Sequence, residues 1–304
     1  DNLIIHGSIE HQSNSPRYYQ QSRMRLHIYY GLDDEIVPDD VTHVIVDDSV
    51  TIIKEDAFRE CQHLVSVIMG DNVKRIEGCA FTHCVALRFI RLSKTLEYIE
   101  EQAFERCESL ETLFLPSTLK SIEYYAFCDC PSFRLLILPH GIDLNSVDYC
   151  INTVSDCNME VSAIFQIAES AGVAIEYDED GTLTDESINR FHEWLVHHMD
   201  DSPFHRLCYD VSITTQHIND YLNDNGNDAA LTIDAIHGMT PLHMLSMNPN
   251  APAETIAALL NANVEAAFRL DNQGKSSLDY AQEYNVGGLV AMINVLCNRR
   301  QQYH

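Results

Sequence analysis

Four cysteines recur at intervals of 23 residues and are the first side chains whose type and spacing suggest chemistry: Cys61, Cys84, Cys107 and Cys130. Thiolates at matched positions of neighbouring repeats could bind a metal ion or pair as disulfides. Each of these cysteines, however, takes the same place in a repeating apolar pattern, where cysteine acts as a small buried hydrophobe. We therefore expect four buried thiols. The close pair Cys128 and Cys130 lacks the Cys-x-x-Cys spacing of a zinc site.

Four histidines also lie close together in the sequence, at His192, His197, His198 and His205. His192 and His197 are five positions apart, which rotates them away from a common helix face. A helical zinc motif needs its two histidines on one face, so we expect no zinc site in this segment.

The acidic segment 176–187 has the outline of a calcium-binding loop. Acidic residues take positions one, three and five, and Gly181 takes position six. Position twelve, where such a loop needs a bidentate glutamate, is Ser187. We expect a solvated acidic turn here, and calcium binding between Asp178 and Asp185 stays open.

Motifs of enzymes are missing from the sequence. It has no nucleophile elbow, phosphate loop, dinucleotide fingerprint or His-Glu-x-x-His motif. We therefore expect no enzymatic activity, no catalytic residue, no cofactor and no resident metal. The 46 acidic against 19 basic residues give a net charge of −27. Nucleic acid is a poor partner, since its phosphates need many Lys and Arg contacts. No apolar run is long enough for membrane insertion.

The cysteine spacing belongs to an internal repeat. The pair Ala-Phe recurs at 57–58, 80–81, 103–104 and 126–127. Each repeat ends in two apolar residues that are two positions apart and therefore point to one side of a strand. One repeat cannot bury its own apolar face, so neighbours must stack. The pattern predicts a parallel sheet with a short helical turn at each Ala-Phe.

This pattern resembles the BspA-type leucine-rich repeat, whose motif runs approximately Ala-Phe-x-x-Cys-x-x-Leu-x-x-Ile-x-Leu-Pro. Leu-Pro stands here at 115–116 and 138–139. The resemblance implies a right-handed solenoid. It also implies a protein-binding or surface-recognition role without enzyme activity.

The outward residues of the predicted strands are unusually apolar for a solvated face. A large exposed apolar patch commonly marks a binding site, so we predict that this stripe binds a protein partner. Two alternatives stay open: ordinary exposure, or coverage by residues 1–35, which include Tyr18, Tyr19, Tyr29 and Tyr30. Arg91 interrupts the stripe and could pair with an acidic group of a partner. The predicted binding residues are Ile45, Ile68, Phe89, Arg91, Thr112, Phe114, Leu135 and Ile137.

A different repeat begins near residue 199. Ser-Pro-Phe-His at 202–205 is followed by Thr-Pro-Leu-His at 240–243 and by Ser-Ser-Leu-Asp at 276–279. Serine or threonine caps a helix, and proline at its first position leaves no hydrogen bond unmade. These units resemble the ankyrin repeat, which implies helix pairs and structural hydrogen bonds from His205 and His243. Second helices are expected at 214–222, 254–260 and 289–296.

The whole pattern predicts an α+β repeat protein in which a leucine-rich-repeat solenoid, with parallel strands and short helical turns, precedes an all-α ankyrin-like array. The predicted parts are an N-terminal capping segment at 1–39, the solenoid at 40–142, a helical cap and linker at 143–198, and the ankyrin-like repeats at 199–298.

Both repeat types are interaction modules, so we predict a non-enzymatic scaffold or adaptor. It would bind a protein partner of unknown identity through the outward solenoid face, the ankyrin groove or both. The alternative is a cell-surface or secreted recognition protein. The first residues lack the basic and apolar regions of a signal peptide, and the sequence has no glycosylation sequon. We therefore expect a cytoplasmic location.

Overall fold

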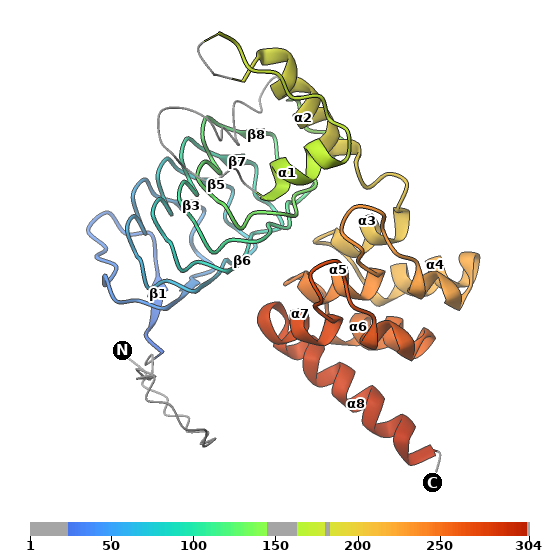
Figure 1. The fold of residues 1–304 in the computed structure, drawn as a ribbon. Helices are drawn as coiled ribbons and strands as arrows, with labels where there is room; N and C mark the ends of the chain where they lie inside the picture. Colours follow the sequence, from blue (N-terminus) through green and yellow to red (C-terminus); the bar gives the residue numbers. More distant parts are fainter. Residues whose placement is uncertain (1–23, 145–162, 180–182, 303–304) are drawn as a thin grey trace, which may run out of the picture.

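The fold is taken from a computed structural model, which describes residues 24–144, 163–179 and 183–302. A strand-rich solenoid forms the first part of the chain, and stacked helix pairs form the last part. The two parts lie side by side, and two further helices lie over one end of the solenoid (Figure 1).

Two parallel sheets run along opposite sides of the solenoid core. The first sheet consists, in order, of β1 (Leu26–Tyr29), β2 (His43–Val46), β4 (Ser66–Ile68) and β6 (Phe89–Arg91). The second consists of β3 (Ile52–Ile53), β5 (Arg75–Ile76), β7 (Tyr98–Ile99) and β8 (Ser121–Ile122). From β2 onward, paired residues are one 23-residue repeat apart, as His43, Ser66 and Phe89 are. Because strand residues alternate in direction, Val44 and Val67 enter the core while their neighbours face outward.

Each Ala-Phe pair lies in a series of turns and not in the expected helical turn. The backbone N–H of Phe58 donates to Ala80 O at 2.8 Å, and that of Glu60 donates to Thr82 O at 2.8 Å. Both acceptors belong to the next repeat, whereas a helix would bond these groups within its own segment. The turn also needs left-handed backbone, with φ of 57° at Asp56 and 60° at Glu60. Stacking between repeats therefore replaces the helical pattern.

A column of phenylalanine rings fills the solenoid core. It comprises Phe58, Phe81, Phe104 and Phe127. Successive ring centroids are 4.9, 5.1 and 5.7 Å apart, and Phe133 continues the column at 5.2 Å. Tyr29 of β1 covers the other end, 5.0 Å from Phe58. Aromatic pairs at these distances stabilise a core beyond the apolar area that they bury.

The four repeat cysteines are buried thiols, as predicted. The last three each donate from Sγ to the carbonyl of the phenylalanine one repeat earlier, at 3.1 to 3.3 Å, as Cys107 does to Phe81. Burial raises the pKa of the Cys61 thiol to about 11, and it raises the pKa of Cys84 further. All eight cysteines among the described residues are free thiols.

Two helices cover the C-terminal end of the solenoid core. They are α1 (Ala163–Ser170) and α2 (Asp185–His197). The backbone N–H of Ile164 donates to Phe133 O at 2.8 Å, and that of Leu138 donates to Leu195 O at 3.0 Å. Thr184 caps α2 with its side chain. The apolar faces of both helices belong to the same buried cluster as the solenoid core, so the last repeat is not left open to water.

Three helix pairs make up the last part of the chain. They are α3 (Pro203–Tyr209) with α4 (Thr215–Asn225), α5 (Pro241–Met247) with α6 (Ala253–Ala262), and α7 (Ser277–Tyr284) with α8 (Val286–Gln302). The connections include two short 3-10 helices, η2 (Asn227–Leu231) and η3 (Val264–Phe268). First helices contact first helices and second helices contact second helices, so the pairs stack in layers.

Local capping explains where these helices begin. The Thr240 side chain accepts from the backbone N–H of His243, whose ring accepts from the backbone N–H of Thr240. The His243 Nε2 lies 3.2 Å from Lys275 O, and the His205 Nε2 lies 2.8 Å from Met239 O. Each histidine therefore bonds to the backbone of the following helix pair, and this ties adjacent layers together.

Candidate protein-binding cleft

Half of the predicted binding stripe is buried inside the chain. Thr112, Phe114, Leu135 and Ile137 are almost inaccessible, which corrects the expectation that they face a partner. The three apolar residues share one buried cluster with the helix pairs. Phe114 stacks on Tyr209 of α3 with ring centroids 4.5 Å apart. The physical reason is that the helix pairs dock on the outward face of the last repeats.

Self-coverage therefore occurs at the last repeats, and the helix pairs provide it. Tyr29 lies in the solenoid core, and Tyr30 is exposed. Tyr18 and Tyr19 lie outside the described residues. A sequence pattern shows which face of a strand is apolar, but it does not show which distant segment packs there.

In the other half of the stripe, Ile68, Phe89 and Arg91 line an open cleft, and Ile45 lies next to Ile68 on the neighbouring strand. Ile45 is 40% exposed and Ile68 is 37% exposed, while Phe89 and Arg91 are half-buried. A cavity of about 630 Å³ lies between this part of the first sheet and the helix pairs. The sheet side is lined by His43, Val65, Ser66, Ile68, Arg88, Phe89 and Arg91, and the opposite side by Pro249, Asn250, Glu283, Tyr284, Asn285 and Val286.

Two buried polar groups of the cleft wall have no hydrogen-bond partner. They are the Asn250 Nδ2 and the Tyr284 hydroxyl. Burial raises the pKa of the Tyr284 phenol, so its hydroxyl keeps its proton and can donate. A buried donor without a partner is costly, so a ligand that supplies an acceptor would be favoured. Both groups suit a ligand that brings carbonyl oxygens.

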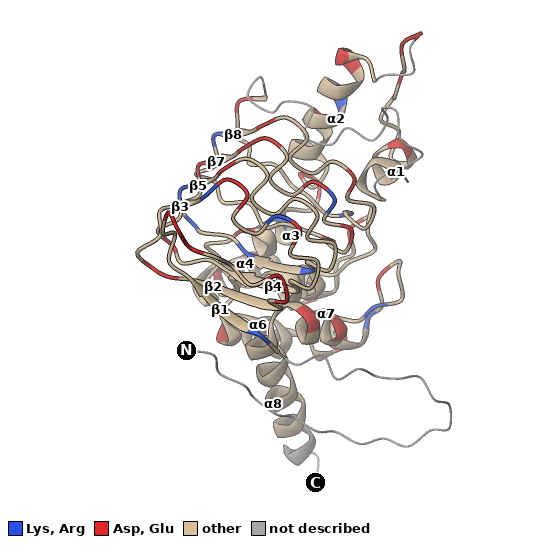
Figure 2. Cartoon of the chain, turned by 90° about the vertical axis from the view of Figure 1, so that its left-hand side faces the viewer, with Lys and Arg blue, Asp and Glu red and all other residues tan. Residues whose placement is uncertain are grey.

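Charges around the cleft are largely paired. The Arg91 Nε donates to Asn250 Oδ1 at 3.1 Å, and its Nη2 lies 3.5 Å from Asp71. This bond crosses from β6 to the loop before α6, so it defines the spacing of the two walls. Glu283 pairs with Lys275 at 3.4 Å. Acidic residues recur along the solenoid turns, whereas residues 286–298 of α8 include no charged side chain (Figure 2).

Several residues of the cleft and of the exposed stripe beside it were missed from the sequence. Ile28 of β1 lies opposite Ile45 and is 42% exposed, so the open stripe begins one strand earlier than predicted. The step from β1 to β2 is 17 residues and not 23, which hid this strand from the repeat pattern. Asn250 and Tyr284 enter the site only because two repeat arrays meet, and no local pattern indicates that.

The other candidate sites are dispersed. Ser187, at position twelve of the acidic segment, is buried, and its hydroxyl accepts from the backbone N–H of Glu176 at 2.8 Å. Its hydroxyl is therefore engaged, while residues 180–182 lie outside the described part of the chain. His192 and His205 are buried, whereas His197 is exposed at the end of α2. The histidines that lie close together in the sequence therefore differ in their surroundings.

Comparison with known proteins identifies the first repeat array. Residues 38–154 match the family model of the BspA type leucine rich repeat region in six copies. This part of the chain is therefore a leucine-rich-repeat solenoid, as the 23-residue pattern predicted. The match spans less than half of the chain and does not extend into the helix pairs. No curated protein matches the chain.

Several solved structures are similar to the solenoid. A leucine-rich-repeat protein of T. pallidum is 25% identical over 39% of this chain, with a TM-score of 0.34. One from Bacteroides ovatus is 32% identical over 34% of this chain, with a TM-score of 0.33. A leucine rich cell surface protein of Faecalibacterium prausnitzii is 24% identical over 47%, with a TM-score of 0.34. The matches cover 55%, 27% and 39% of those proteins, respectively.

Within the described ranges, no helix has both the length and the apolar character needed to cross a membrane.

Proposed function

We propose that this protein is a non-enzymatic scaffold that binds a protein partner in the cleft between the first sheet and the helix pairs. The cleft itself is the observation that carries the proposal. Ile68 lines it and continues through Ile45 to Ile28 as an exposed ridge on the first sheet, and two unpartnered donors lie on the opposite wall. Cavities of a few hundred Å³ with apolar walls and few polar groups are typical of binding sites.

An extended segment of a partner fits this chemistry best. Its apolar side chains would cover the isoleucine ridge, which lies along one line because the strands are in register. Its backbone carbonyls would accept from the Asn250 Nδ2 and the Tyr284 hydroxyl after small side-chain rotations. Burial of the exposed isoleucines and satisfaction of the two donors would both favour the complex.

The helix pairs supply the second wall, and we propose that they are ankyrin-like repeats. The support is local: Thr240 and His243 form a reciprocal cap, and His243 bonds to the backbone of the next pair. The layered stacking of first and second helices supports the same assignment. Such arrays are interaction modules, which agrees with a scaffold and not with an enzyme.

We propose an intracellular location on the basis of the cysteine ladder. Its cysteines act as reduced thiols, because the S–H groups of the last three donate hydrogen bonds to backbone carbonyls in the core. Reducing compartments keep cysteine in this form.

Affinity capture from source lysate tests the binding proposal, followed by titration of the purified partner. Ile45→Glu and Ile68→Glu should each weaken binding by about tenfold or more, which corresponds to ~1.4 kcal/mol. Ile52→Glu is the matched control, because Ile52 is 38% exposed but lies on β3 of the opposite sheet. A partner that is retained equally by all three variants would bind elsewhere, and the cleft proposal would then be wrong.

A further inference from the structure

Two histidines and one aspartate converge outside the cleft, where the solenoid meets the helix pairs. The His140 Nε2 lies 2.9 Å from Asp200 Oδ1, and the His197 Nδ1 lies 2.8 Å from Asp200 Oδ2. One donor atom from each residue lies within 4.8 Å of the others. Among the described residues, these are the three side chains of the His, Cys, Asp or Glu type that lie close enough together to hold a metal ion.

The three residues come from different elements. His140 follows the last solenoid strand segment, His197 ends α2, and Asp200 lies in the turn before α3. His140 and His197 are far apart in the sequence. The expectation of no zinc site rested on the spacing of His192 and His197, which does not include His140.

Hydrogen bonds to the main chain fix the backbone segments that carry the three side chains. The backbone of Leu138 bonds to α2 near its end, and the backbone N–H of Asp200 donates to His197 O at 2.9 Å. Arg206 donates from Nη1 to Val196 O at 2.6 Å and from Nη2 to Leu138 O at 3.3 Å. These bonds join the backbones that carry the ligands, so little ordering is needed when an ion binds.

Arg206 also orients the carboxylate. Its Nη1 lies 3.1 Å from Asp200 Oδ1. Carboxylates and histidines that bind metals are commonly held by hydrogen bonds of this kind from outside the coordination sphere. The guanidinium adds a positive charge near the site, but the chain as a whole carries a net charge of −27, which favours cations.

Without a metal, the contacts form a hydrogen-bonded cluster in which each imidazole presents a proton to the carboxylate. A metal ion would bind the same two nitrogen atoms and one carboxylate oxygen, and each neutral imidazole would then carry its proton on its other ring nitrogen, His140 Nδ1 and His197 Nε2. All three side chains are partly exposed, so an ion can enter from solvent.

We propose that His140, His197 and Asp200 form a binding site for a divalent transition-metal ion of the zinc type. Two imidazoles among three ligands favour Zn²⁺, Ni²⁺ or Cu²⁺ over Ca²⁺ or Mg²⁺, which prefer oxygen. Three protein ligands leave a coordination position for water. The ligands come from both repeat arrays and from the cap between them. A bound ion would therefore stabilise the contact between the solenoid and the helix pairs.

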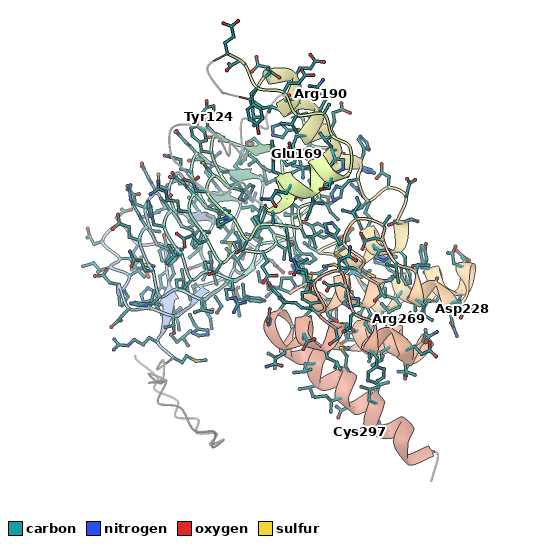
Figure 3. All side chains as sticks on the ribbon, viewed as in Figure 1. Tyr124, Glu169, Arg190, Asp228, Arg269 and Cys297 are labelled. Carbon is teal, nitrogen blue, oxygen red and sulfur yellow. The ribbon has the colours of Figure 1, made fainter. Side chains whose placement is uncertain are left out.

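Calorimetric titration with ZnCl₂ tests this site. The wild type should bind one equivalent, and His140→Gln and Asp200→Asn should each weaken binding at least about tenfold, since even outer-shell changes cost that much. The controls are His217→Gln on α4 and Cys297→Ser on α8, both exposed and outside the group. Cys297 lies near the far end of α8 (Figure 3).

Thermal unfolding separates a site from scattered surface binding. Zn²⁺ should raise the midpoint of the wild type and of both controls, and it should leave the two ligand variants unchanged. Circular dichroism without metal should show that the ligand variants are folded. The proposal is overturned if the wild type takes up no Zn²⁺, or if the ligand variants bind it as tightly as the controls do.

Discussion

Arg134 and Tyr280 are joined by a buried hydrogen bond, in which the Arg134 Nη2 donates to the Tyr280 hydroxyl at 2.7 Å. Arg134 belongs to the last solenoid repeat and Tyr280 to α7, so the bond connects the two arrays. The same guanidinium donates twice to Glu111 Oε2 at 3.2 Å, and Lys275 approaches Glu111 Oε1 at 3.3 Å. The junction is therefore ionic at one edge and apolar at the other, where Phe114 lies.

Loss of the buried arginine should be costly. In Arg134→Leu, the Glu111 carboxylate and the Tyr280 hydroxyl lose their main donor in a region closed to water. Removal of one partner from a buried pair costs ~3–5 kcal/mol, which we expect to see in urea unfolding. Arg25→Leu is the control, because its pair with Asp40 is exposed and should cost below ~1 kcal/mol. Equal losses in the two variants would contradict a buried junction.

Truncation of the stripe should distinguish its two halves. Phe114→Ala should lower the free energy of unfolding by ~3–5 kcal/mol, because the ring is only 2% exposed and stacks on Tyr209. Ile68→Ala, at the open half, should change it by about 1 kcal/mol or less. Chemical denaturation measures both. If Phe114→Ala were as mild as Ile68→Ala, the helix pairs would not cover this part of the sheet.

Thiol labelling should report the cysteine ladder. A disulfide reagent at pH 8 should modify the exposed Cys297 rapidly, whereas the buried ladder thiols should react only on unfolding. Burial raises the pKa of Cys61 to about 11, so little thiolate forms at that pH even if the reagent enters. Counting modified thiols by mass in native buffer and in urea checks this. Rapid native labelling of Cys84 or Cys107 would contradict the packed core.

Acid should destabilise the fold through its buried histidines. Burial lowers the pKa of His192, His198 and His237 to about 4, below the ordinary value near 6.5 of the unfolded chain. Between these values the unfolded chain binds protons that the native chain does not. Stability should therefore fall from pH 6.5 to pH 4, by up to ~1.4 kcal/mol per pH unit for each such histidine.

A single substitution can assign part of this slope. His198→Asn keeps a donor where the His198 Nδ1 meets Trp194 O at 3.0 Å, and it removes the titrating ring. Urea unfolding at several pH values should give a shallower pH dependence for the variant. A variant with the same slope as the wild type would show that His198 does not titrate with folding.

Periodic features were predictable because they depend on local repetition. The Ala-Phe and cysteine positions define which residues enter the solenoid core, and the column from Phe58 to Phe127 follows from them. Thr240 and the following proline likewise placed the start of α5. Capping and strand alternation act over a few residues, so the sequence pattern is sufficient to predict them.

Contacts between the arrays were not predictable in the same way. Phe114 and Ile68 occupy similar outward positions in their repeats, yet one is buried and the other is open. The difference arises from where the helix pairs dock on the sheet. Asn250 joined the cleft for the same reason. A single sequence contains no periodic signal for such a contact.

The left-handed residues of the solenoid turns determine how the array must form. Asp56 and Glu60 have equivalents in each following repeat, and none of the eight is glycine. Left-handed backbone costs a residue with a side chain ~1–2 kcal/mol. The compensating bonds, such as Phe58 N–H to Ala80 O, reach into the neighbouring repeat. A lone turn is therefore unstable, and we expect folding to begin with two adjacent turns and to spread from one repeat to the next.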